Sequence, residues 1–68
     1  MPDVSLEQLT ERERDVALLV GRGCSDKDIA RVLNIEFATV RTRLGNCLTK
    51  LQCSNRGEMA ALVSRLSH

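Results

Sequence analysis

Hydrophobic residues recur every three or four positions along most of the chain, and polar residues fill the positions between them. This spacing is typical of amphipathic helices, each of which buries one apolar stripe. Four such segments are predicted, at about residues 11–22, 26–33, 37–51 and 56–66. No segment alternates apolar and polar residues over a useful strand length. The pattern therefore predicts an all-α fold, a compact four-helix domain.

Residues that favour helix ends separate these segments. Thr10 with Glu13 fits a capping box, in which each side chain bonds a free backbone N–H of the first turn. Ser25 is placed to cap the second segment, and Asn55 with Glu58 repeats the cap and its reciprocal acid before the fourth.

Gly23 and Asn34 follow the first two segments. Both residue types tolerate positive φ, so they are expected to end these helices in tight turns. The stripes expected to be buried are Val16, Leu19 and Val20; Ile29, Val32 and Leu33; Val40, Leu44, Cys47, Leu48 and Leu51; and Met59, Leu62, Val63 and Leu66.

The size of the chain limits its function. Its 68 residues make one small domain, and with one Phe and no Trp or Tyr the core must be aliphatic. A core this small leaves little room for a deep substrate pocket. No paired acid, base or nucleophile is evident either, so we expect no enzyme activity and no cofactor.

Composition also indicates the compartment. No apolar run approaches the roughly 18 residues of a membrane span, so no membrane partner is expected. Cys24, Cys47 and Cys53 lack metal-site spacing, and Cys47 is expected to be a small buried hydrophobe. His68 is expected to be a solvated end. We therefore expect a reduced, cytoplasmic protein with no metal and no small-molecule ligand.

The charge is unevenly distributed along the chain. Residues 1–36 carry five basic and eight acidic side chains, whereas residues 37–68 carry five basic side chains and one acidic. A single surface facing DNA would produce this asymmetry, although an ordinary solvated face would also fit.

The third segment, residues 37–51, places polar residues opposite its apolar stripe. Thr42, Asn46 and Thr49 point away from the core, Thr39 and Gly45 lie close by, and Arg41, Arg43 and Lys50 flank them. A helix in the major groove needs small polar residues toward the bases and long cations at the rims. An amphipathic surface helix with a polar outer face is the alternative interpretation.

The order of motifs adds a family resemblance. They are LTxRE at Leu9–Glu13, GxSxKxIAxxL at Gly23–Leu33, TVxxxxxN at Thr39–Asn46, and KL at Lys50–Leu51 with a following Arg56. In this order the chain resembles the LuxR-type (GerE-like) helix-turn-helix domain of response regulators and quorum-sensing regulators. The resemblance covers residues 9–66, with the helix-turn-helix at 26–45, and leaves residues 1–8 as an N-terminal tail or linker remnant.

The resemblance implies sequence-specific binding of double-stranded DNA by a bacterial transcription regulator. The third helix would enter the major groove, and the fourth would join a homodimer on inverted-repeat sites. Such a regulator can also contact RNA polymerase. The positions matched to base-facing sites are Arg41, Thr42 and Gly45. Those matched to DNA-backbone sites are Lys27, Thr39, Arg43, Asn46, Lys50 and Arg56. The fourth-helix residues expected at the dimer contact are Ala61, Ser64 and Arg65.

Structural alternatives remain open for two of these residues. Asn46 could brace a loop, and Lys27 could pair with Asp26 or Asp28.

Three positions depart from the family pattern. Glu36 replaces a Ser cap, Arg43 replaces a His, and Gly45 replaces a longer polar or basic side chain. These departures bear on which DNA sequence the chain would prefer. A protein-interaction module with weak or no DNA binding is the main alternative function.

A region of a sigma factor, which has a related helix-turn-helix, is an alternative identity for this chain. The continuous match to the LuxR-type pattern through Arg56 argues against that alternative. In the family this domain usually follows a regulatory domain, which does not fit in 68 residues. The chain is thus expected to be an excised output domain or a short stand-alone member.

Overall fold

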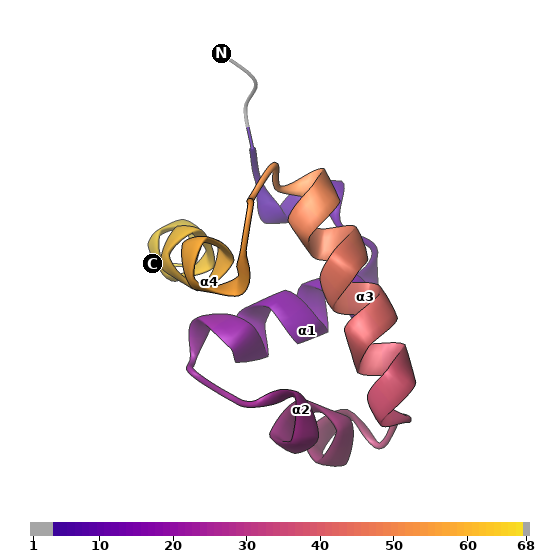
Figure 1. The fold of residues 1–68 in the computed structure, drawn as a ribbon. Helices are drawn as coiled ribbons and strands as arrows, with labels where there is room; N and C mark the ends of the chain where they lie inside the picture. The colour runs from indigo at the N-terminus through magenta and orange to yellow at the C-terminus, as the bar shows by residue number, and fades with distance from the viewer. Residues whose placement is uncertain (1–3, 68) are drawn as a thin grey trace.

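The computed structural model describes residues 4–67, which form four α-helices after a short 3-10 turn (Figure 1). Their bounds are η1 Leu6–Gln8, α1 Glu11–Gly21, α2 Asp26–Leu33, α3 Phe37–Lys50 and α4 Arg56–Leu66. The predicted all-α fold is confirmed. Helices α2 and α4 have the predicted bounds, whereas α1 and α3 each end one residue earlier than predicted. Residues 1–3 of the predicted tail, and His68, lie outside the described residues.

Helix α1 packs against each of the other three helices, and α2 also packs against α3 (Figure 1). All four helices contribute to one core. Its buried hydrophobic residues are Leu9, Val16, Ala17, Val20, Ile29, Val40, Cys47, Leu51, Met59 and Val63. The burial predicted for Cys47 is confirmed.

Two residues of the predicted stripes lie outside the core, contrary to the prediction: Val32 on α2 and Leu66, which is the last residue of α4 and is 36% exposed. Val32 is 60% exposed, although it was expected on the buried face of α2. Ile29 and Leu33 already face inward from this short helix, so Val32 lies to one side of their stripe. There it borders a shallow hollow between α1 and α2.

The first three helices end in the same way. Each is followed by one residue with positive φ: Gly23 at 88°, Asn34 at 55° and Gln52 at 58°. The next N–H then donates to a carbonyl five residues earlier, in the pairs Cys24–Leu19, Ile35–Ala30 and Cys53–Leu48. This is the Schellman motif. The positive φ values predicted for Gly23 and Asn34 are confirmed.

The caps at the helix starts follow the sequence with one change. The Thr10 hydroxyl accepts from Glu13 N at 3.2 Å, and the Glu13 carboxylate accepts from Thr10 N at 2.9 Å, which confirms the capping box. The Asn55 side chain accepts from Glu58 N at 2.8 Å, as predicted. The Glu58 carboxylate, however, accepts from Ser54 N at 3.0 Å instead of closing a box with Asn55.

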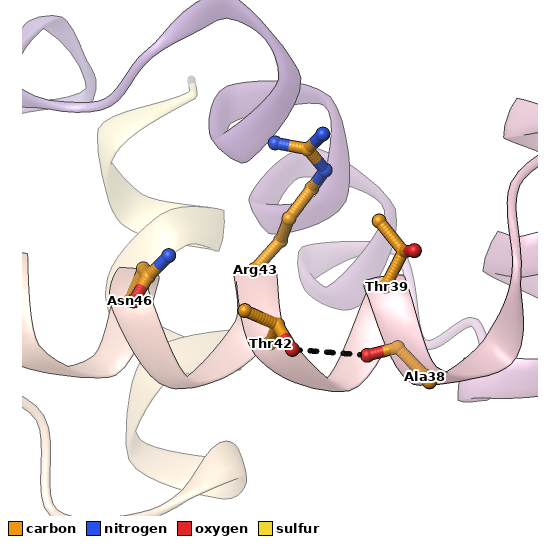
Figure 2. A pocket seen from close by; sticks show the side chains of 5 residues that line it. All are labelled: Ala38, Thr39, Thr42, Arg43 and Asn46. Atoms are coloured by element: carbon orange, nitrogen blue, oxygen red, sulfur yellow. Dashed lines mark hydrogen bonds between the residues drawn. The ribbon is translucent and has the colours of Figure 1, made fainter.

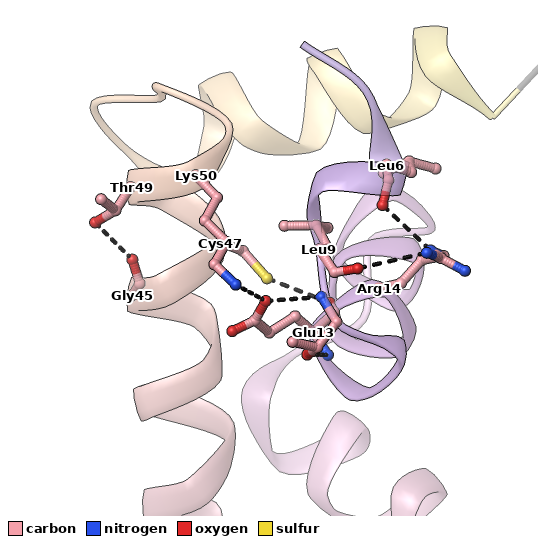
Figure 3. A network of polar contacts seen from close by, with 9 residues as sticks. Leu6, Leu9, Glu13, Arg14, Gly45, Cys47, Thr49 and Lys50 are labelled. Atoms are coloured by element: carbon pink, nitrogen blue, oxygen red, sulfur yellow. Dashed lines mark hydrogen bonds and ion pairs between the residues drawn. The ribbon is translucent and has the colours of Figure 1, made fainter.

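Glu13 also joins α1 to α3 (Figure 3). It is only 5% exposed, and its Oε1 accepts from Lys50 Nζ at 2.7 Å. Its backbone carbonyl accepts from the Cys47 thiol at 3.2 Å. The hydrogen bond from Lys50 is the main reason that the pKa of Glu13 lies below its ordinary value. Burial, together with the Glu13 charge, raises the pKa of the Cys47 thiol to about 11.

Arg14 holds the turn that precedes α1. Its guanidinium donates to the carbonyl of Leu6 at 3.2 Å and to that of Leu9 at 3.4 Å. Val4 and Leu6 pack against the core. Part of the segment predicted as a tail is therefore folded onto the helices.

We expect Glu13→Gln to lower the free energy of unfolding at neutral pH by about 1–2 kcal/mol, because the charged hydrogen bond to Lys50 is lost. The native pKa of Glu13 lies below 4.5, its ordinary value. Its stabilising effect is therefore complete above that value and is lost as the pH falls through the native pKa.

Urea denaturation of both proteins across a pH series tests this expectation. The stability difference between wild type and variant should shrink in acid. A difference that stays constant down to about pH 3 would show that the Glu13 charge does not stabilise the fold.

Candidate nucleic-acid interface

Helices α2 and α3 form the helix-turn-helix. The Ser25 hydroxyl caps α2 by accepting from Asp28 N at 3.2 Å, and Asn34 supplies the left-handed turn at its end. Ile29 on α2 and Val40 on α3 are both fully buried. These contacts fix the inner face of α3, so its opposite face points to solvent.

The outer face of α3 carries the residues expected to meet DNA. Arg41, Thr42, Gly45 and Asn46 are exposed, while Thr39 and Arg43 are half-buried. Part of this face forms an open hollow of about 300 Å³, lined by Ala38, Thr39, Thr42, Arg43 and Asn46 (Figure 2). In Figure 2, Arg43 and Thr39 rise from the same side of the helix, and Arg43 extends furthest from it.

Two threonines on this face donate their hydroxyl protons to the helix itself. Thr42 Oγ1 donates to Ala38 O, and Thr49 Oγ1 donates to Gly45 O, both at 3.1 Å. What each side chain offers outward is therefore a methyl group and acceptor lone pairs. A methyl group suits contact with a thymine methyl in the major groove.

Three of the expected DNA-contacting cations have no ion-pair partner among residues 4–67: Lys27, Arg41 and Arg43. Asp26 pairs with Arg56, and Asp28 pairs with Arg31 at 2.9 Å. Both acids beside Lys27 thus have other partners, which leaves its charge uncompensated. The Arg43 Nε is buried and makes no hydrogen bond within the described residues.

The other two cations are engaged inside the protein. Lys50 is paired with Glu13, although its side chain stays 39% exposed. Arg56 pairs with Asp26 and also donates to the carbonyl of Cys24 at 2.6 Å. These bonds tie the start of α4 to the first residue of α2 and to the connection that precedes it. The sequence pattern did not indicate either internal partner, because each lies about thirty or more residues away.

The structure adds Phe37 to the surface around Arg41. Phe37 is 47% exposed, and the Arg41 guanidinium carbon lies 6.0 Å from the centroid of its ring. Phe37 begins α3, where a single hydrophobic residue carries no sequence signal of a surface role.

The remaining site residues lie on α4 and at the start of α3. Ala61, Ser64 and Arg65 are exposed on α4, so all three are accessible for the expected dimer contact. Glu36 is the N-cap residue of α3 but makes no side-chain cap bond, and its carboxylate remains exposed. A Cβ added at Gly45 would meet nothing within 4 Å, so packing does not require glycine there.

Within residues 4–67 no helix is long and apolar enough to cross a membrane. Across the same residues, no three His, Cys, Asp or Glu side chains come together as a metal site.

Comparison with known proteins agrees with the motif order. A family model described as "Bacterial regulatory proteins, luxR family" matches residues 7–63. The response regulator protein VraR of Staphylococcus aureus (strain NCTC 8325 / PS 47) is 42% identical over 62 residues, which is 91% of this chain and 29% of that protein. The VraR proteins of Staphylococcus saprophyticus and Staphylococcus epidermidis give the same values. The chain thus spans less than a third of the length of these relatives.

We expect Gly45→Ala to raise the free energy of unfolding by about 0.5–1 kcal/mol, because alanine is the better helix former. The added methyl group would meet open space. Thermal or urea denaturation measures the change.

Gly21→Ala is the matched control, because its Cβ would lie 2.9 Å from Val63 Cγ1 on α4. Overpacking should make this variant less stable than wild type. A destabilised Gly45→Ala would show that the fold itself needs glycine at this position.

Proposed function

Because the chain belongs to the luxR family of bacterial regulatory proteins, we propose that it binds specific sequences of double-stranded DNA, with α3 in the major groove. The observation that carries this proposal is the exposed polar face of α3, flanked by two arginines without ion-pair partners. No cofactor and no catalytic step belong to this function.

Arg41, Thr42 and Gly45 are proposed to face the bases. The Arg41 guanidinium can donate two hydrogen bonds to guanine O6 and N7, and the Thr42 methyl can pack against a thymine methyl. Gly45 presents no side chain, so the backbone of α3 can come close to the base edges.

Lys27, Thr39, Arg43 and Asn46 are proposed to contact the phosphate backbone. Such contacts fix the position of α3 in the groove without reading sequence. Lys27 and Arg43 are the stronger candidates, because their charges have no partner in the described chain.

Lys50 and Arg56 take a different part in this proposal. Lys50 has three donors and directs one to Glu13, so two remain for a phosphate, with its charge partly compensated. Arg56 is held by Asp26 and Cys24, so its first role is to fix α4. A phosphate contact from Arg56 would be secondary.

We further propose that two chains bind an inverted repeat through α4. The exposed residues Ala61, Ser64 and Arg65 would meet their counterparts, with half-sites about one helical turn apart. The relatives are named response regulators, and we propose that this chain serves as the DNA-binding output domain of such a regulator, a cytoplasmic role that includes contact with RNA polymerase.

Binding to a mixed-sequence duplex should weaken steeply as salt rises. Lys27 and Arg43, the two uncompensated cations proposed to contact phosphates, predict a slope of log affinity against log salt of about −2 per chain, at about −0.9 per phosphate contact. Fluorescence anisotropy of a labelled duplex across a salt series measures this slope, and titration at saturation gives the number of chains per duplex. No binding even at low salt would contradict the proposed function and favour the protein-interaction module.

We expect Arg41→Ala and Lys27→Ala to weaken DNA binding in different ways. Arg41→Ala should weaken a site selected from a random duplex library by about 1–3 kcal/mol and mixed-sequence DNA much less. Lys27→Ala should weaken both DNAs alike and make the salt slope shallower by about 1. Arg22→Ala removes an exposed arginine outside the proposed contacts and serves as the control. Equal losses on both DNAs for Arg41→Ala would show that Arg41 reads no base.

A further inference from the structure

Phe37 is the only aromatic residue of the chain and the first residue of α3. Nearly half of its surface is exposed. It is absent from the set of hydrophobic residues that form or pack against the core over residues 4–67. The fold therefore does not depend on burying this ring.

Arg41 lies one helical turn after Phe37, on the same side of α3. Its guanidinium carbon is positioned over the Phe37 ring, 6.0 Å from the centroid. A guanidinium at this distance is attracted by the negative face of the ring. No carboxylate in the described part of the chain pairs with Arg41, so none competes with the Phe37 ring for its guanidinium.

An arginine on an exposed helix face loses rotamer freedom when it binds a base. A side chain already held in the bound orientation loses less, so specific binding is strengthened. Contacts with mixed-sequence DNA need no fixed guanidinium orientation and benefit less.

We infer that Phe37 is a positioning residue for DNA recognition: its ring holds the Arg41 guanidinium in the orientation that meets a base. This inference rests on the proposed function, because it needs α3 to read DNA. It makes the discrimination shown by Arg41 depend on a neighbouring ring that need not touch a base.

The direction in which discrimination changes on removing the ring depends on how the ring holds Arg41. If the ring held Arg41 away from the groove, removing the ring would improve discrimination. If the ring presents Arg41 to the groove, removing it lowers discrimination.

The test compares Phe37→Leu, which keeps an apolar side chain without a ring, with Phe37→Trp, which keeps a ring face. Each is made in the wild-type and in the Arg41→Ala background. The measured quantity is the ratio of dissociation constants for mixed-sequence DNA and for a duplex selected by the wild-type chain. We expect Phe37→Leu to lower this ratio about two- to five-fold, the range of an exposed cation–π contact. Phe37→Trp should preserve the ratio, and Phe37→Leu should have no effect once Arg41 is absent.

Nuclear magnetic resonance provides a reading that does not need DNA. The Arg41 side-chain signals should carry a ring-current shift in the wild-type chain and in Phe37→Trp, and should lose it in Phe37→Leu.

The outcomes separate this inference from the proposed function. If Phe37→Leu leaves the discrimination between the two DNAs unchanged or improves it, the proposed role of Phe37 is overturned, but the proposed function is not. An equal loss in the Arg41→Ala background would also overturn the role of Phe37, because the ring would then act through the helix and not through Arg41. A wild-type chain that binds no duplex would overturn the proposed function and this inference together.

Discussion

The contacts of Glu13 fix the orientation of α3, and the surface that α3 presents depends on that orientation. One buried carboxylate closes the first turn of α1 and accepts from Lys50, while its backbone carbonyl accepts from Cys47. Both partners lie in the C-terminal half of α3, so the helix is held in rotation as well as in position. A small aliphatic core alone specifies rotation less sharply, because aliphatic side chains repack easily. The hydrogen bonds of Glu13 are directional, so they restrict the rotation of α3 in addition to the apolar contacts.

This arrangement also changes how the charge of the chain should be counted. Residues 37–68 are strongly basic in sequence, but Lys50 and Arg56 pair with acids from the N-terminal half. In return, Asp26 and Asp28 have partners other than Lys27, so a lysine that looked neutralised keeps its charge. The charge that the surface carries therefore depends on which ion pairs form in the folded chain. Net charge by segment did not indicate which of the cations have an internal partner and which remain uncompensated.

Features that depend on neighbours in sequence could be predicted. The capping box at Thr10, the turn residues Gly23 and Asn34 and the buried Cys47 each follow from helical spacing or local backbone chemistry. Gln52 has the same left-handed conformation as Gly23, but glutamine gives no such signal. Contacts between distant segments were equally invisible, as with the pairs Glu13–Lys50 and Asp26–Arg56. Tertiary packing decides these contacts, and local patterns cannot specify them.

The surface of α3 that is proposed to face DNA carries few side chains, and this bears on the proposed specificity. Gly45 has no packing or backbone reason to be glycine, so its cost in helix stability, about 1 kcal/mol relative to alanine, is not offset within the fold. With no side chain at that position, Arg41 and Thr42 are the side chains that remain among the residues proposed to face the bases, and the Thr42 hydroxyl already donates to Ala38 O. Most hydrogen-bonded discrimination would then fall to one guanidinium. A single flexible arginine discriminates well only when its orientation is restricted. The absence of a side chain at position 45 therefore leaves most of the proposed discrimination to Arg41, and the ring at position 37 is what would restrict the orientation of Arg41.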